Sequence, residues 1–233
     1  QNKIIDKDTW DSCYFFGARN ILRLTDGRLL ATMYGNLSCD KAMVTRDISA
    51  IGETKYKAST FVVSSSDNGI NWELYAMVGK TLETDPIGEG FNEPTMERLF
   101  NGEIMCVMRT GHFYPLYAAW SNDEGKTWCE PIYTGFERAC SPCLLKLSDG
   151  KLVLAYGQRF PVGSSPHSFS DEMTQFQTNN QVKLAICEDG KGRKWIDMTI
   201  GYNLGSTYVT IHEVSSNTLL CQTDGFCWMI KLK

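Results

Sequence analysis

The sequence lacks several features that mark common classes of protein. No run approaches the roughly 20 consecutive apolar residues that a membrane-spanning helix needs, so no membrane span is expected. Basic residues are not in excess, because 23 Lys and Arg stand against 27 Asp and Glu, and this balance disfavours nucleic acid as a partner. Long charged or Gly/Ser-rich tracts are also missing, which argues against disorder.

Motifs for cofactor chemistry are missing as well. The chain has no Gly-rich phosphate loop and no HExxH, GxSxG or EF-hand pattern, so we expect no cofactor and no metal. Nine cysteines are present, an odd number that cannot all pair within the chain. Cys140 and Cys143 have the spacing of half a zinc site, but no second such pair accompanies them. Buried free thiols are therefore the expected state.

What is present is repetition. Four segments share an alternating apolar stretch, a short turn and a second apolar stretch, and their turns are Asp26-Gly27, Asn101-Gly102, Asp149-Gly150 and Ser216-Asn217. Asp-Gly and Asn-Gly tolerate the positive φ angles of a type I′ turn. These segments therefore predict tight β-hairpins, of which the Ser-Asn turn is the weakest.

A second repeated element follows each of the first three hairpins. Residues 65–72 and 121–128 both fit the pattern S-x-D-x-G-x-x-W, and residues 187–195 are a degenerate copy with one extra residue. In this pattern the Asp caps loop amides, the Gly takes a left-handed conformation and the Trp packs beneath the turn. The element thus predicts a second hairpin in each unit.

Two hairpins per unit make a four-stranded antiparallel blade. The predicted blades cover residues 12–79, 88–134, 138–200 and 205–233, and the last ends near its third strand. Helical patterns are almost absent. Radially repeated four-stranded sheets are typical of a β-propeller, so we expect an all-β fold in which residues 1–233 form a single domain.

The octapeptide is the Asp-box, also called the bacterial neuraminidase repeat. It occurs with Phe91-Asn-Glu93-Pro94, with Met108-Arg109 at the end of the same hairpin, and with Tyr156-Gly-Gln-Arg159 one blade later. Together these motifs make the chain resemble the sialidase superfamily, specifically its Asp-box-repeat hydrolase-like members. The resemblance covers nearly the whole chain. It implies a six-bladed propeller of which four units are visible, a glycan substrate, and a secreted or periplasmic location.

The chemistry of that superfamily sets the residue types to look for. A sialic acid carries a carboxylate on its anomeric carbon, and guanidinium groups bind a carboxylate in bidentate fashion without losing charge. A carboxylate nucleophile would be repelled by such a substrate. Sialidases use a neutral Tyr instead, activated by a neighbouring Glu, with an Asp as general acid.

The resemblance assigns these roles to particular residues. It casts Glu93 as the Glu that assists the nucleophile and Arg109 as a carboxylate-binding Arg, although a structural salt bridge is the alternative for this pair. Arg159 closes the equivalent strand of the next blade and is a candidate for a further carboxylate-binding Arg. Tyr208 stands just before the fourth hairpin and is the candidate nucleophile, against the alternative of a buried structural Tyr.

Other positions match less well. Arg19 is a candidate for the first Arg, but Ala18-Arg19-Asn20 stands where Arg-Ile-Pro is usual, and Asn180-Gln181 occupies the usual place of the third Arg. Asp40 is the proposed general acid, with Asp47 as an alternative in the same loop. His112 and Tyr114, which follow Arg109, are candidates for contact with the sugar.

Three functions are compatible with these residues. The first is a sialidase-like glycoside hydrolase that removes a terminal sialic acid or related acidic sugar from glycans through a Tyr/Glu pair. The second is a non-catalytic Asp-box propeller that binds glycan or protein, because the fold alone does not imply function. The third is a hydrolase or lyase for another acidic sugar, such as a uronate.

Overall fold

The computed structural model describes residues 10–14, 20–37, 57–82, 87–111, 114–159, 181–202, 208–223 and 225–232. All the regular secondary structure among these residues is β-strand, and the strands form antiparallel sheets. The structure therefore confirms the all-β prediction. Within the described part of the chain, no helix is long and apolar enough to cross a membrane.

The strands form four sheets, each built almost entirely from consecutive strands. The first sheet contains β1 (Trp10–Tyr14), β2 (Ile21–Arg23), β3 (Leu29–Leu37), β4 (Ser59–Ser65) and β5 (Glu73–Gly79), with both β1 and β2 paired to β3. The second contains β6 (Asn92–Arg98), β7 (Ile104–Arg109), β8 (Tyr117–Ser121) and β9 (Ile132–Tyr133). The third contains β10 (Ala139–Lys146), β11 (Leu152–Gln158), β12 (Gln181–Cys187) and β13 (Ile196–Tyr202). The fourth contains β14 (Thr210–Ser215), β15 (Thr218–Thr223) and β16 (Phe226–Lys231).

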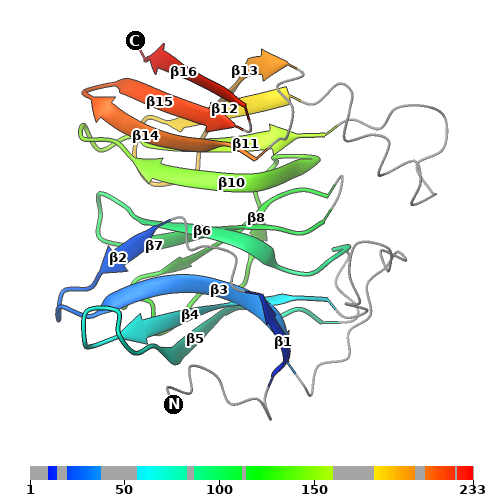
Figure 1. The fold of residues 1–233 in the computed structure, drawn as a ribbon, viewed down its shortest axis with the longest axis vertical. Helices are drawn as coiled ribbons and strands as arrows, with labels where there is room; N and C mark the ends of the chain where they lie inside the picture. Colours follow the sequence, from blue (N-terminus) through cyan, green and yellow to red (C-terminus); the bar gives the residue numbers. More distant parts are fainter. Residues whose placement is uncertain are drawn as a thin grey trace.

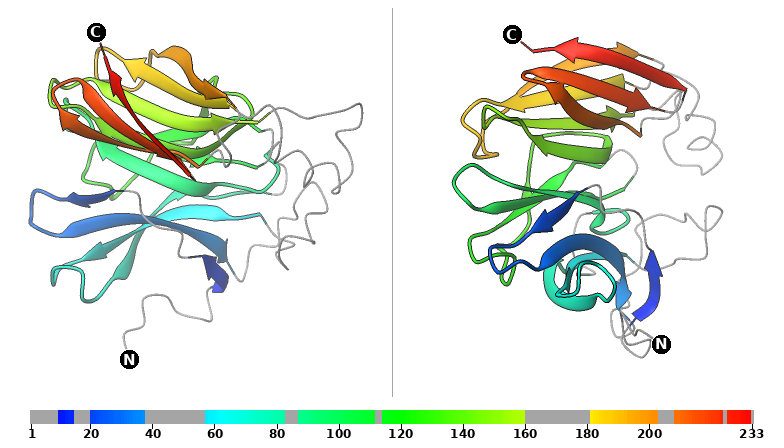
Figure 2. Two further views of the ribbon diagram at one scale, coloured as in Figure 1. Left: turned by 45° about the horizontal axis from the view of Figure 1, so that its top comes forward. Right: turned by 60° about the vertical axis from the view of Figure 1, so that its left-hand side comes forward.

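The sheets follow one another in space in the order in which they occur in the chain. Figure 1 shows the first sheet at the bottom and the fourth at the top, and Figure 2 shows the same succession from two other sides. Strand β6 contacts β3 on one side and β10 on the other, and β10 also contacts β14. The first strand of each later sheet therefore lies against the sheet before it, as in successive blades.

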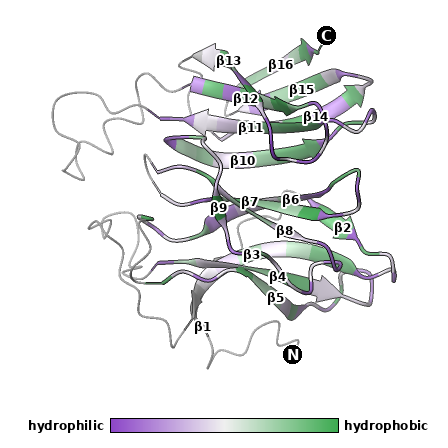
Figure 3. Ribbon diagram, turned by 180° about the vertical axis from the view of Figure 1, so that it is seen from behind, coloured by the Kyte–Doolittle hydropathy of each residue, from purple (hydrophilic) through white to green (hydrophobic). Residues whose placement is uncertain are grey.

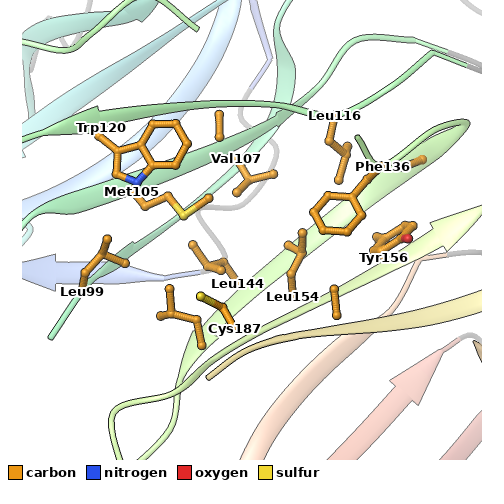
Figure 4. Close-up of a cluster of buried hydrophobic side chains, with 14 residues drawn as sticks. Leu99, Met105, Val107, Leu116, Trp120, Phe136, Leu144, Leu154, Tyr156 and Cys187 are labelled. Atoms are coloured by element: carbon orange, nitrogen blue, oxygen red, sulfur yellow. The ribbon is translucent and has the colours of Figure 1, made fainter. Parts of the chain in front are cut away.

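Apolar side chains fill the space between successive sheets. Figure 3 shows hydrophobic stretches along the strands and hydrophilic ones at many of the turns. In the cluster of Figure 4, Leu99, Met105 and Trp120 from the second sheet pack with Leu144 and Leu154 from the third, and each is 6% exposed or less. Similar clusters lie between the first and second sheets and between the third and fourth. Because strand residues alternate between faces, each middle sheet contributes to two of these cores.

The hairpin turns differ from the predicted type I′ form. A type I′ turn needs positive φ at both central residues, but only the glycines have it, with φ of 90° at Gly27, 89° at Gly102 and 91° at Gly150. The residue before each glycine instead accepts the backbone N–H two residues further on, as Asp26 Oδ1 does from Arg28 at 3.1 Å. The Asp or Asn side chain thus stabilises a type I turn followed by a left-handed Gly.

The Asp-boxes have the predicted geometry. In the second box, Asp123 Oδ1 accepts the N–H of Thr127 at 2.9 Å, and Trp128 Nε1 donates to the carbonyl of Gly125 at 3.0 Å. Ser121 Oγ accepts the N–H of Gly125 at 2.9 Å. In the degenerate third box, Cys187 Sγ takes the place of that hydroxyl and accepts the N–H of Gly192 at 3.2 Å. The turn therefore survives the change of sequence.

Hydrogen bonds also join the second and third sheets along β6 and β10. Three alternate residues of β6 accept backbone N–H groups of β10, in the pairs Ser141–Glu93 (3.1 Å), Leu144–Thr95 (3.2 Å) and Lys146–Glu97 (3.3 Å). Asn20 Nδ2 donates to the carbonyls of Met96 and Leu144 at 3.2 and 2.9 Å. These bonds fix the relative position of the two inner strands, and they place Glu93 at one end of the row.

Candidate active site

Four of the residues predicted from the sequence meet on one side of the molecule, where strands of successive sheets begin or end. Glu93 lies near the start of β6, Arg109 ends β7, Arg159 follows β11 and Tyr208 precedes β14. In an antiparallel meander, the start of the first strand lies next to the end of the second. This topology explains why residues so far apart in the chain come together.

The Tyr208 hydroxyl donates a hydrogen bond to Glu93 Oε1 at 2.6 Å. The other carboxylate oxygen, Oε2, accepts the backbone N–H of Ser141 at 3.1 Å. Both Glu93 and Ser141 have positive φ, 40° and 51°, and β10 is irregular between Cys140 and Cys143. Non-Gly residues adopt this conformation at an energetic cost, and such strain is often found at functional sites.

Arg109 lies between two carboxylates. Its Nη1 is 2.6 Å from Glu93 Oε1, and its Nη2 is 3.3 Å from Glu89 Oε2. The residue is only 5% exposed, so the guanidinium is largely removed from water. Glu89 also accepts a hydrogen bond from Asn92 Nδ2 at 3.1 Å. A buried cation needs such partners, because its desolvation is costly.

Arg159 provides a second guanidinium near the phenol. Its Cζ lies 5.9 Å from the centre of the Tyr208 ring, within the range of a cation–π contact. Its backbone N–H donates to the carbonyl of Arg138 at 3.0 Å, and the residue is 5% exposed. Tyr208 itself is 39% exposed. The phenol is therefore the most accessible member of this group.

The electrostatics of the group differ from those of isolated side chains. Burial alone would raise the pKa of Glu93, but the charge of Arg109 and the hydrogen bonds from Tyr208 and Arg109 outweigh it and lower that pKa. Burial and the negative charge of Glu93 together raise the pKa of Tyr208 to about 12. Burial opposes the charge of Arg109, but Glu89 and Glu93 raise the pKa of the guanidinium. At neutral pH the site therefore holds a protonated phenol beside an ionised carboxylate.

Two further side chains, which the sequence did not indicate, join the group. Glu89 pairs with Arg109, and Tyr34 in β3 lies close enough for Glu93 and Arg109 to influence the pKa of its hydroxyl, which burial raises. Tyr34 stands at the same distance from the turn Gly27 as Arg109 does from Gly102. This repeat register is the signal that could have found Tyr34.

The remaining predicted site residues have different outcomes. Tyr114 is described, and its ring packs against Gly88, where an added Cβ would lie 2.6 Å from Tyr114 Cε2. Gly88 precedes Glu89, so Tyr114 lies beside the group. Arg19, Asp40, Asp47 and His112 lie outside the described residues. Among the residues that the structure describes, no cluster of three or more His, Cys, Asp or Glu could hold a metal ion.

Glu93 makes the stability of the protein depend on pH. A carboxylate with a lowered pKa stabilises the fold at pH above its unfolded value, about 4.3, and this contribution is lost as pH falls through the folded value. We therefore expect Glu93→Gln to be destabilised at pH 7, and its difference from wild type to shrink only below about pH 4. Urea unfolding at a series of pH values measures this difference. A difference in stability between wild type and Glu93→Gln that disappears already near pH 6 would contradict the lowered pKa of Glu93.

Gly90 holds the Glu89 segment in place by close backbone approach. It has φ of 82°, and an added Cβ would lie 2.2 Å from the carbonyl oxygen of Ala58. We expect Gly90→Ala to cost about 2–3 kcal/mol, because backbone must move as well as adopt a strained φ. Gly27→Ala is the matched control, since Gly27 has φ of 90° and nothing within 4 Å of an added Cβ. It should cost only about 1 kcal/mol in the same urea titration. Equal losses would show that the contact with Ala58 is unimportant.

Solved structures with the same fold are β-propeller glycosidases and related proteins. A protein of unknown function from Dyadobacter fermentans matches with 22% identity and a TM-score of 0.62, covering 90% of this chain and 48% of that one. A Penicillium chrysogenum alpha-L-arabinanase matches with 15% identity and a TM-score of 0.56, covering 86% and 55%. A Hadza microbial sialidase matches with 18% identity and a TM-score of 0.57, covering 87% and 40%. The chain thus spans about half the length of these proteins, and the similarity shows the β-propeller fold.

The sequence itself carries the family signature. No match was found among curated protein sequences. A sequence model of the BNR repeat-like domain family, however, matches residues 15–200, which is most of the chain. This match and the two intact Asp-boxes confirm the predicted relationship to the sialidase-like superfamily. The chain therefore belongs to the BNR repeat-like domain family.

Proposed function

We propose that this chain carries the catalytic pair of a retaining glycoside hydrolase that removes a terminal sialic acid or related acidic sugar from glycans. Tyr208 is the proposed nucleophile and Glu93 the base that receives its proton. The observation that carries the proposal is the 2.6 Å hydrogen bond from the Tyr208 hydroxyl to Glu93 Oε1. Two guanidiniums, those of Arg109 and Arg159, accompany this pair.

The acid–base state of the pair suits this reaction. A pKa of about 12 keeps the Tyr208 hydroxyl protonated at neutral pH, so it is a neutral group that an anionic sugar does not repel. As the phenol oxygen bonds to the anomeric carbon, its proton passes to Glu93 and the glycosidic C–O bond breaks. A general acid protonates the departing oxygen, a role proposed for Asp40, which lies outside the described residues. Water then cleaves the glycosyl–tyrosine bond with net retention.

The relatives in structure support a glycoside hydrolase without defining the sugar. They include an arabinanase and a sialidase, and their identity to this chain is below 20%. The choice of an acidic sugar rests instead on the neutral nucleophile and on the guanidinium of Arg159 near it. A sialidase and an arabinanase both act on glycans, so a glycan substrate is common to these functions.

A panel of fluorogenic glycosides tests the proposal. We expect turnover of an aryl sialoside or aryl uronide and little turnover of an aryl arabinofuranoside. A derivative of the accepted sugar that carries fluorine on the carbon next to the anomeric carbon, together with a good leaving group, should accumulate as a covalent adduct, and mass spectrometry should locate that adduct on Tyr208. Binding of the free sugar without turnover would favour a non-catalytic propeller, and an adduct on another residue would remove Tyr208 from its role.

A further inference from the structure

Arg109 is engaged by two carboxylates of the protein itself. Nη1 lies 2.6 Å from Glu93 and Nη2 lies 3.3 Å from Glu89, while 94% of the side chain is shielded from solvent. A guanidinium binds a carboxylate most strongly when two of its N–H groups donate in parallel. Here both terminal amino groups already face protein carboxylates, and the two negative charges oppose the approach of a third anion to Arg109.

The position of Glu89 is fixed by the backbone on both sides of it. Its carbonyl accepts the N–H of Ala58 at 2.9 Å, and its own N–H donates to the carbonyl of Thr110 at 2.9 Å. Asn92 Nδ2 then holds the carboxylate at 3.1 Å. The backbone bonds connect Glu89 to segments of two different sheets and fix its main chain, and the bond from Asn92 holds its carboxylate beside Arg109.

The formal charges of the four charged side chains described in this group cancel. Glu89 and Glu93 offset Arg109 and Arg159, whereas removal of the Glu89 charge would leave a net positive charge at the same place. We propose that Glu89 is a specificity-determining residue: it holds Arg109 as a structural cation and limits the preference of the site for anionic sugars, so that Arg159 meets the acidic group of the substrate. This inference rests on the proposed function, and it assigns to Arg109 a role different from the one expected from the sequence.

The test compares an acidic sugar with its methyl ester, in which the negative charge is removed and one methyl group is added. For wild type and each variant we would measure kcat/KM for an aryl sialoside and for its methyl ester, and the affinities of free sialic acid and its methyl ester by calorimetry. Glu89→Gln is expected to raise the acid-over-ester ratio about tenfold, because a partner of Arg109 becomes neutral. Arg159→Met is expected to lower that ratio at least tenfold in the presence of Glu89.

Glu124→Gln is the matched control. Glu124 also pairs with an arginine of the second sheet, Arg98, at 2.6 Å, and this pair lies at the opposite end of β6 from Glu93. The acid-over-ester ratio of Glu124→Gln should stay within about twofold of that of wild type. Circular dichroism shows whether each variant is folded, and Arg159→Met decides the question if Glu89→Gln does not fold.

The outcomes separate this inference from the proposed function. Absence of turnover by wild type would end the proposed function, while the calorimetric ratios would still test the role of Glu89. An unchanged or lowered ratio in Glu89→Gln would show that Glu89 does not limit the preference for the acid. An undiminished ratio in Arg159→Met would show that Arg159 does not receive the acid. Either result would overturn the inference. Failure of wild type to bind either the acid or the ester would overturn both.

Discussion

Replacement of Tyr208 by Phe is expected to lower kcat on the accepted sugar by about 10³-fold or more, because the substitution removes the attacking oxygen. The ring remains, and with it the contact with Arg159, whose Cζ lies 5.9 Å from the ring centre. We therefore expect KM to change by only a few-fold. Steady-state kinetics of the purified variant, with circular dichroism to confirm the fold, measures both quantities.

Tyr133→Phe is the matched control for this experiment. Tyr133 also donates a hydrogen bond to a glutamate, Glu137, but this pair is exposed at the edge of the second sheet. Loss of that hydroxyl should leave kcat unchanged. Equal residual activity in the two variants would mean that the phenol of Tyr208 is not the nucleophile.

The second large effect is expected for Arg109→Met, on stability. Without the buried guanidinium, the carboxylates of Glu89 and Glu93, whose side chains are 17% and 16% exposed, lose the charge that neutralises them both. Removing one partner of a buried ion pair typically costs about 3–5 kcal/mol. Urea unfolding at pH 7 measures the loss. The double variant Arg109→Met/Glu89→Gln should recover part of it, because one of the two uncompensated charges is then also gone.

Arg98→Met provides the comparison. Arg98 pairs with Glu124 at 2.6 Å, but the two side chains are 22% and 27% exposed, so water replaces the lost contact. Such pairs contribute about 0–1 kcal/mol. If Arg109→Met proved as mild as Arg98→Met, the Glu89–Arg109–Glu93 group would not be the buried network described above.

The parts of this fold that could be predicted are those written in short stretches of sequence. A hairpin needs only its turn and two alternating strands, and an Asp-box needs only eight residues, so both were visible without any knowledge of the whole. The predicted type I′ turn was wrong because Asp26, Asn101 and Asp149 stabilise a type I turn with their own side chains. That choice depends on a side-chain hydrogen bond that the dipeptide Asp-Gly does not specify.

The candidate site was only partly predictable, for a related reason. Glu93, Arg109, Arg159 and Tyr208 stand at strand ends, where the register of the repeat indicates a common edge, and the structure brings them together. Glu89 precedes the strand in a stretch without periodicity. Its position depends on backbone hydrogen bonds to Ala58 and Thr110, which belong to distant segments. No local pattern could have placed it.

The meander within each sheet has a consequence for how the molecule reaches its native state. Most neighbouring strands are close in sequence, so most of the loops that close within a sheet are short and cost little entropy, the connections from β3 to β4 and from β11 to β12 being longer. Each sheet can therefore form early. Glu93, Ser141 and Tyr208, in contrast, come from three different sheets and meet only after those sheets dock. During refolding, strand content should therefore return before the Tyr208–Glu93 contact, and variants that weaken the contacts between sheets should be rich in β-structure yet lack that contact.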